Sequence, residues 1–202
     1  MKQGKGGSAA VLIDFWNFAI ITRECYEVGL RSSPYGNVSR LNWTSLPTIV
    51  LSEYRNQTGK DLTVEPENVR FYGGLHAGDL KLREYLNRLS DRHGYAILTS
   101  ERATRDRTCP KCHGEFSVTV EKGVDVEIGL DLISGNYRTV FLLSADTDLL
   151  PAVRRAKTNG RRVIYVGPRE RYGAFTEHCY TAIFTETILS RIVRIVPQIA
   201  AL

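Results

Sequence analysis

The sequence has no long apolar run. Nothing in its 202 residues approaches the roughly 18 consecutive apolar residues of a membrane-spanning helix. The apolar run near the start covers only residues 9–13 and ends at Asp14, whereas the core of a secretory signal needs about 7–15 apolar residues. We therefore expect neither a signal peptide nor a membrane partner.

Cysteine is also scarce. The four cysteines, Cys25, Cys109, Cys112 and Cys179, are too few and too scattered for the disulfide scaffold of a secreted domain of this length. We expect a reduced, cytoplasmic protein. The sequence further lacks internal repeats, low-complexity segments and a Gly-rich phosphate loop ending in Lys and Ser or Thr, and this last absence disfavours a P-loop nucleotide-binding protein.

What is present is the composition of an ordinary globular protein. Apolar residues make up 43% and charged residues 24% of the chain, and the length suits one α/β domain with a sizeable core. The 27 Lys and Arg residues outnumber the 22 Asp and Glu residues, which gives a formal net charge of +5. This basic excess permits a nucleic-acid partner, but many unrelated proteins share it.

Short β-branched runs alternate with helical patterns along the chain. Strands are predicted at 10–13, 69–72, 95–98, 140–143, 163–166 and 182–184, and helices at 15–28, 43–58, 82–93, 122–133, 149–157 and 186–202. This alternation indicates a three-layer α/β sandwich with a mainly parallel sheet of five or six strands and helices on both faces. The domain should cover 9–185, after a flexible segment 1–8, with the polar segment 100–120 as a Cys-containing basic insertion.

Acidic residues follow two of the predicted strands. Asp14 ends the first strand, and Asp146 and Asp148 lie just beyond the strand at 140–143. In open α/β sheets, ligands bind outside the carboxyl ends of the strands. Carboxylates gathered at such an edge repel one another unless a cation neutralises them, and Mg²⁺ or Mn²⁺ suits oxygen ligands.

A third acidic element precedes a predicted helix. Gly123 should permit a close backbone approach, and Asp125 then lies near the helix N-terminus. Asp131, six residues later, points about 120° away around the helix. Asp125 is therefore a candidate ligand, whereas Asp131 is a structural or supporting residue.

Each of these residues also has a simpler interpretation. Asp148 could serve only as a helix cap, and Asp14 could cap the following helix with Asn17 incidental. Otherwise the Asn17 amide, one turn into that helix, could hold Asp14, a metal-bound water or a substrate phosphate. Ser144 and Thr147 could bind phosphate or a carboxylate, or could act as local caps.

Taken together, these motifs resemble the NYN domain, the branch of the PIN-like nucleases that includes the LabA-like proteins. The shared pattern is an apolar strand ending in Asp14 with Asn17 three residues on, then Lys-Gly-x-Asp at 122–125 with Asp131 as a later acid. Ser-x-Asp-x-Asp follows at 144–148, before an apolar helix. The resemblance spans about 9–184. Trp16, which is bulkier than the residue often found there, and the cysteine segment depart from the family pattern.

The resemblance implies a PIN-like, Rossmannoid sandwich and metal-dependent cleavage of RNA that leaves 5′-phosphate ends. It implies that Asp14, Asp125, Asp146 and Asp148 hold the Mg²⁺ or Mn²⁺ ions and that Asn17 assists. One ion would activate the attacking water, and a second would stabilise the leaving oxygen. No protein nucleophile is then required.

The insertion carries a Cys-x-x-Cys pair, Cys109 and Cys112. Such a pair predicts zinc strongly only when a second pair follows, and none does. Further ligands could come from His93, His113, His178, Cys179 or another subunit. A redox pair would follow a strand at a helix start, which fits poorly, so the alternative is two reduced cysteines in a hairpin.

Basic residues crowd the same insertion and a later segment. Arg102, Arg105, Arg107 and Lys111 directly precede the helix that carries Asp125, so we expect them to contact phosphates of the substrate. A second cluster comprises Arg154, Arg155, Lys157, Arg161 and Arg162. A solvated surface explains this second cluster at least as well as RNA contact does.

Three functions follow from these features. The leading hypothesis is an endoribonuclease, and the alternative is an RNA-binding or regulatory adaptor that keeps the fold but cleaves poorly. A phosphohydrolase of the haloacid type fits poorly, because Trp16 occupies the position of its second Asp. Finally, the apolar surplus of the last helix (Ile188, Leu189, Ile192, Val193, Val196 and Ile199) predicts a homodimer, unless that helix is buried on two sides within one chain.

Overall fold

The computed structural model describes residues 9–24 and 41–193 of the chain. Its centre is a six-stranded, wholly parallel sheet with the strand order β3-β2-β1-β6-β7-β8. The strands are β1 (Ala9–Asp14), β2 (Val69–Leu75), β3 (Ala96–Glu101), β6 (Thr139–Leu143), β7 (Arg162–Gly167) and β8 (Thr181–Phe184). The predicted parallel α/β sheet is therefore confirmed, with six strands.

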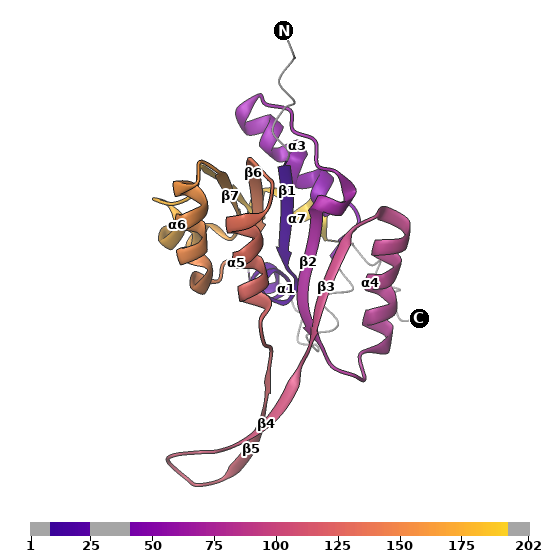
Figure 1. The fold of residues 1–202 in the computed structure, drawn as a ribbon, viewed down its shortest axis with the longest axis vertical. Coiled ribbons are helices and arrows are strands. Elements are labelled where there is room, and N and C mark those ends of the chain that lie inside the picture. The colour runs from indigo at the N-terminus through magenta and orange to yellow at the C-terminus, as the bar shows by residue number, and fades with distance from the viewer. Residues whose placement is uncertain (1–8, 25–40, 194–202) are drawn as a thin grey trace, which may run out of the picture.

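Helices cover both faces of this sheet (Figure 1). One face packs against α5 (Val124–Ser134) and α6 (Leu150–Thr158). The other packs against α1 (Phe15–Glu24), α3 (Leu46–Thr58), α4 (Leu80–His93) and α7 (Thr185–Ile192). The chain also forms three short 3-10 helices, η1 (Pro66–Asn68), η2 (Thr147–Leu149) and η3 (Arg169–Phe175). The arrangement is the expected three-layer sandwich.

The strand β1 lies in the middle of the sheet and is covered by helices on both faces. All six of its residues are buried. Val11 and Ile13 enter the core under α1 and α3, whereas Ala10 and Leu12 enter the core under α5 and α6. A strand covered on both faces reads as a continuous apolar run rather than an alternating one, and this is the run that ends at Asp14.

The order of the strands creates a switch point beside β1. The chain proceeds from β1 to β2 and β3 on one side, and β6, β7 and β8 continue on the other. In such sheets ligands bind outside the carboxyl ends of the strands at this point. Asp14 and Asp146 lie at this edge.

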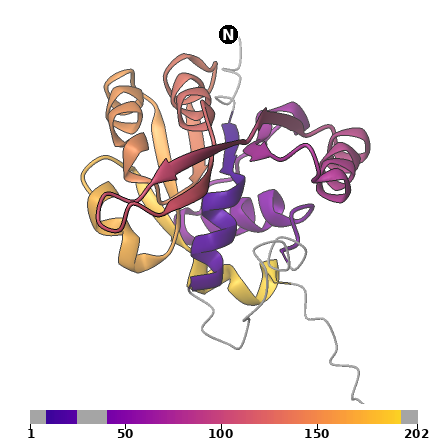
Figure 2. The same ribbon diagram turned by 90° about the horizontal axis from the view of Figure 1, so that it is seen from below.

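The insertion differs most from its prediction. Residues 100 and 101 belong to β3, and the following segment forms an antiparallel hairpin of β4 (Ala103–Thr108) and β5 (Glu115–Val120). The hairpin projects away from the domain in Figure 1 and lies in front of it in Figure 2, the view from below. Every residue of β4 is exposed, so neither face needed the apolar alternation by which strands are recognised in a sequence.

The described part of α7 leaves little apolar surface for a partner. Ile188 and Ile192 are fully buried, and Leu189 and Val193 pack against the same core. The simpler interpretation, a helix buried within its own chain, accounts for these four residues. Val196 and Ile199 lie outside the described residues, as do 1–8, the predicted helix end at 25–28 and the predicted helix beyond Val193. None of the helices in the described ranges is long and apolar enough to span a bilayer.

Candidate metal centre

Three carboxylates meet at the switch point of the sheet. Asp14, Asp125 and Asp146 each place one oxygen within 4.8 Å of the others. They come from the end of β1, the first turn of α5 and the loop after β6. The sequence predicted this convergence, because the carboxyl ends of neighbouring parallel strands share one edge.

Asp14 is the buried member of this group, with 6% of its surface exposed. One carboxylate oxygen accepts a hydrogen bond from the Asn17 backbone N–H (3.3 Å), and the other accepts one from Ser144 Oγ (3.0 Å). Burial raises the pKa of Asp14 to about 7, and the charges of Asp125 and Glu121 act in the same direction; the two hydrogen bonds oppose the rise. The site therefore holds a carboxylate whose ionised form needs a cation.

Ser144 binds a carboxylate of the site, which is one of the alternatives that the sequence left open, and has no phosphate-binding position. Its side chain is fully buried. It donates to Asp14 and accepts from the backbone N–H of Asp146 (3.1 Å). Because a buried hydroxyl with two partners cannot reach a substrate, we assign Ser144 to positioning two of the three carboxylates.

Asn17 is not incidental. Its side-chain oxygen accepts a hydrogen bond from the Ala145 N–H at 2.9 Å, so it ties the first turn of α1 to the loop after β6. Asp14 meanwhile caps that same turn through the Asn17 backbone. Of the two interpretations left open by the sequence, the capping by Asp14 is present, whereas the Asn17 side chain holds Ala145 rather than Asp14. This contact, 128 positions away, has no signal in the local sequence.

Asp148 lies outside the three-carboxylate group. Its side chain is exposed, and the cap of η2 is Asp146, whose Oδ1 accepts the Asp148 N–H at 2.9 Å. The suggested capping role thus belongs to Asp146. Partial burial raises the pKa of Asp125, and the charges of Asp146, Asp148 and Glu121 raise it further. Asp148 contributes negative charge near the centre, and Thr147 beside it is exposed.

Gly123 was predicted to permit a close approach of the backbone, but its structural role is different. A Cβ at this position would meet nothing within 4 Å. The backbone instead has φ of +83°, a left-handed conformation that strains residues with side chains. Gly123 makes the turn that starts α5 at Val124 and brings Asp125 to the centre.

The base of the hairpin is fixed to the site. Arg102 pairs with Glu121 at 2.8 Å, and its guanidinium lies 4.5 Å from the centroid of the Trp16 ring. Glu121 also accepts the Gly74 N–H, and Trp16 donates to the Gly74 carbonyl at 2.7 Å. Arg102 was predicted to contact phosphate, but its guanidinium pairs with Glu121 instead. The contact between this guanidinium and the Trp16 ring accounts for the bulky residue at position 16.

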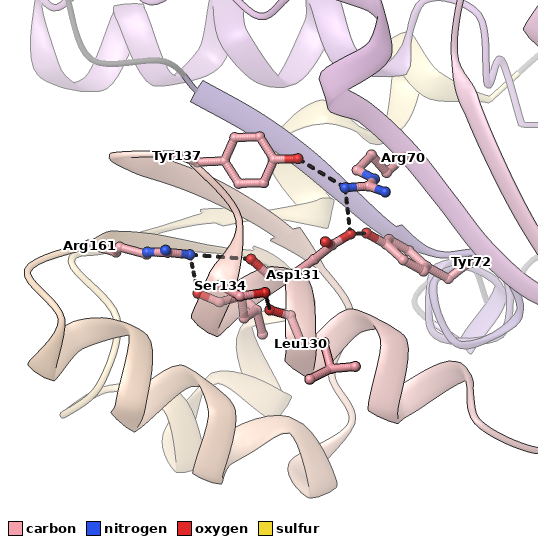
Figure 3. Close-up of polar contacts among 8 residues, drawn as sticks. Arg70, Tyr72, Leu130, Asp131, Ser134, Tyr137 and Arg161 are labelled. Carbon is pink, nitrogen blue, oxygen red and sulfur yellow. Dashed lines mark hydrogen bonds and ion pairs between the residues drawn. The ribbon is translucent and has the colours of Figure 1, made fainter.

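Asp131 faces away from the centre, as the helical spacing predicted. Its carboxylate pairs with Arg70 at 2.8 Å and accepts a hydrogen bond from the Tyr72 hydroxyl (Figure 3). Tyr137 joins the network through Arg70 (3.0 Å), and Arg161 donates to the Asp131 and Leu132 carbonyls at the end of α5. This network fastens α5 to β2 and so fixes the direction of the helix that presents Asp125.

A groove of about 460 Å³ adjoins the start of α5. Its walls come from β2, β3 and the first turn of α5, including Tyr72, Leu98, Ser100, Lys122 and Glu127. The buried Oγ of Ser100 has no hydrogen-bond partner within the described parts of the chain. The groove thus offers both apolar walls and polar groups next to Asp125.

The remaining basic residues divide into two kinds. Arg105, Arg107 and Lys111 are exposed on the hairpin, as an RNA contact requires. Within the second cluster, Arg161 holds the end of α5, Arg154 contacts His178, Lys157 contacts the Glu177 carbonyl and Arg162 lies over the Tyr180 ring. Four members of that cluster therefore have structural contacts.

The cysteine pair stands at the hairpin tip. Among the described residues, the only group of three or more potential metal ligands is the aspartate centre, so the pair has no third ligand there. His93 stacks near Tyr95, His178 contacts Arg154 and Cys179 packs in the core under α6. None of these three, nor His113 beside the pair, forms with Cys109 and Cys112 a group of ligand atoms within 4.8 Å of one another in the described residues.

Comparisons with known proteins identify the family. The family model described as "NYN domain" matches residues 8–186. A search of curated proteins found no match. Among solved structures, ribokinase from Giardia lamblia matches with 12% identity and a TM-score of 0.36, over 73% of this chain and 50% of that one. A protein assigned as a 2-keto-3-deoxygluconate kinase from Enterococcus faecalis matches with 10% identity and a TM-score of 0.33, over 61% and 46%.

This chain spans about half the length of each of these two proteins, and similarity at this level has no functional implication. The family match, by contrast, covers nearly all the described residues and includes every element that supplies the aspartate centre. With its six-stranded parallel sheet between two helical layers and a carboxylate cluster at the switch point, the chain belongs to the NYN domain family and has its PIN-like nuclease fold.

Proposed function

We propose that the protein is a divalent-metal-dependent endoribonuclease. The observation that carries this proposal is the convergence of Asp14, Asp125 and Asp146 within 4.8 Å at the ligand-binding edge of an NYN sheet. None of the ion pairs among the described residues includes any of the three. A cluster of carboxylates with no basic partner fits a hard divalent cation such as Mg²⁺ or Mn²⁺.

The three carboxylates would hold the metal, and the surrounding residues would keep them in place. A divalent cation bound there supplies an activated water and neutralises charge on the phosphate. Ser144 fixes Asp14 relative to Asp146, and Asn17 fixes the loop between them. These contacts hold the ligands in position before the substrate arrives, which is what catalysis by charge stabilisation requires. Asp148 and Glu121 would add negative charge around the metal without binding it directly.

The groove beside Asp125 supports a polynucleotide substrate. Lys122, at its rim, immediately precedes the turn that presents Asp125. Its ammonium group is suited to a phosphate next to the scissile one, and the apolar walls suit a base. The volume of about 460 Å³ is within the usual range of small-ligand pockets.

One face of the hairpin has the composition of a single-strand binding surface. Arg107 lies opposite Phe116, and Arg105 lies opposite Val118; residues opposite each other in an antiparallel pair share a face. The Phe116 side chain is 47% exposed. Guanidinium groups for phosphates beside an aromatic ring for bases are the recurring features of single-stranded nucleic-acid binding. The sequence prediction included both arginines but missed Phe116.

Cleavage assays with labelled RNA and DNA of the same sequence test the proposal. With Mn²⁺ or Mg²⁺ we expect internal cleavage of RNA, products with 5′-phosphate ends that a ligase accepts, and no cleavage in chelator. The activity should elute with the protein through a final sizing column. A wild-type protein that binds RNA but fails to cleave it with either metal would instead support the adaptor.

A further inference from the structure

The tip of the hairpin, residues 109–114, folds into a tight turn that places two thiols side by side. The Cys109 N–H donates to the Gly114 carbonyl and the His113 N–H donates to the Cys109 carbonyl, both at 2.9 Å. His113 has φ of 55°, so the chain turns back sharply just after Cys112. The Cys112 thiol is close enough to Cys109 to share a hydrogen bond with it.

The turn leaves both sulfurs accessible, since Cys112 is exposed and Cys109 is half-buried. Zinc binds cysteine in its thiolate form. Both cysteines are free thiols, so the turn presents two reduced sulfurs at solvent.

Two thiolates are half of a structural zinc site, which is almost always four-coordinate and tetrahedral. No third ligand atom of the described residues, that of His113 included, forms a group with the two sulfurs in which all lie within 4.8 Å of one another. The hairpin carries its tip away from the rest of the domain (Figure 1). The same projection leaves the tip open to another molecule. A second copy of the tip, related by a twofold axis, would supply the two missing thiolates, since a twofold interface uses the same surface of both copies.

The charges near the tip favour such a pairing. Four thiolates around one zinc ion leave a local charge of −2. Each hairpin carries the exposed basic side chains of Arg105, Arg107 and Lys111 against the exposed acidic side chains of Asp106 and Glu115, a surplus of one positive charge. Two tips in contact therefore bring a basic surplus to an anionic centre.

We propose that Cys109 and Cys112 from two copies of this chain bind one zinc ion, so that the protein dimerises through its hairpin tips. The site depends on residues at the end of the hairpin and is independent of the nuclease proposal. It also differs from the dimer expected through the last helix, since the described apolar residues of α7 are buried in their own chain.

Zinc content and molar mass, measured on the full chain purified under reducing conditions, test the proposal. We expect one zinc per two chains and a dimeric mass by light scattering, with both lost in a strong chelator and both restored by zinc alone. Cobalt in place of zinc should show the visible absorption of a tetrahedral four-thiolate site. A monomer with one zinc per chain, a dimer that survives complete removal of zinc, or a reduced chain that stays monomeric and metal-free in added zinc would each overturn the proposal.

Variants separate loss of the site from loss of the fold. Cys109→Ser with Cys112→Ser should abolish zinc binding and dimerisation but leave the thermal unfolding of the domain unchanged, because the tip is exposed. Cys112→His should retain zinc and the dimer, since imidazole is also a zinc ligand. Cys179→Ser, in the core under α6, is the matched control and should keep the zinc stoichiometry. Equal zinc content in the double serine variant and the wild type would place the metal elsewhere.

Discussion

Asp146 is the residue at which charge can be removed with the least disturbance of structure. Its Oδ1 accepts the Asp148 N–H, and an asparagine oxygen can accept the same bond. Asp146→Asn should therefore fold normally, bind RNA and lose cleavage by at least about 100-fold, because even groups that merely orient a ligand are worth about 10–100-fold. Initial rates with saturating RNA, beside RNA affinity measured in chelator, would check this.

Asp148→Asn is the matched control for that experiment. It removes the same formal charge two residues away, from an exposed side chain outside the three-carboxylate group. We expect a smaller loss, within about 10-fold, that additional metal partly restores. If Asp148→Asn were as damaging as Asp146→Asn, Asp148 would be a direct metal ligand. If Asp146→Asn cleaved RNA at the wild-type rate, the aspartate centre would not be the catalytic site.

Asp14 predicts how the stability of the metal-free protein depends on pH. Its pKa is about 7 in the folded state against 3.8 for an ordinary Asp, so between those values the unfolded chain has lost a proton that the folded chain keeps. The free energy of unfolding should fall as pH rises from about 4 to 7, by roughly 4 kcal/mol at most. Denaturant titrations in chelator measure it.

Asp14→Asn supplies the comparison, because the amide is neutral at every pH. In chelator at pH 8 the variant should be more stable than the wild type, and the difference should vanish near pH 4. A weaker slope of the same sign should remain, since the pKa of Asp125 is also raised. A wild-type stability that rises over this range would contradict the account of the buried carboxyl.

At the scale of elements, the hairpin is where binding and cleavage should separate. Arg105→Ala and Arg107→Ala should weaken RNA binding and each reduce the salt dependence by about one phosphate contact. Phe116→Ala should cost about 1–3 kcal/mol of binding with little change in salt dependence, as stacking does. Thr104→Ala, on the opposite face of β4, is the control. Affinities measured over a salt series that do not distinguish the two faces would argue against this surface.

The anchor of the hairpin has its own test at Gly74. A Cβ there would lie 2.8 Å from Arg102 Cγ and 2.9 Å from two carbons of Glu121, so Gly74→Ala must displace the pair that fixes the hairpin base. We expect cleavage to fall several-fold with the metal requirement unchanged. Gly78→Ala, where nothing lies within 4 Å, should behave as wild type. Equal rates for both variants would show that the hairpin position is immaterial to cleavage.

For the molecule as a whole, the features that could be predicted from the sequence are those that follow from hydrophobic periodicity and from the alternation of strands and helices. The parallel sheet, the helical layers and the meeting of Asp14 with Asp146 follow from short apolar strands that end in acid. Asp125 was predicted from its position at a helix start, and Asp148, which was predicted to join the other three, lies outside their group. The roles of Ser144, Asn17 and Glu121 depend on contacts with residues 130, 128 and 47 positions away, and local pattern contains no information about such pairs. A hairpin was one of the alternatives for the cysteine segment, but its two strands were not predicted, since they have no buried face.

Metal binding should be visible in the stability of the entire domain, because the three ligands come from β1, α5 and the loop after β6 and meet only in the folded chain. Mn²⁺ at about 100 times its dissociation constant should add about 2.7 kcal/mol, which raises the melting temperature by about 5–10 °C for a domain of this size. Asp146→Asn should lose most of this increase, whereas Thr104→Ala on the hairpin should keep it. The effect is distinct from zinc at the hairpin tip, since Cys109→Ser with Cys112→Ser should retain the full rise with Mn²⁺. A melting temperature that does not respond to Mn²⁺ or Mg²⁺ in the wild type would mean that the carboxylates meet without binding either metal.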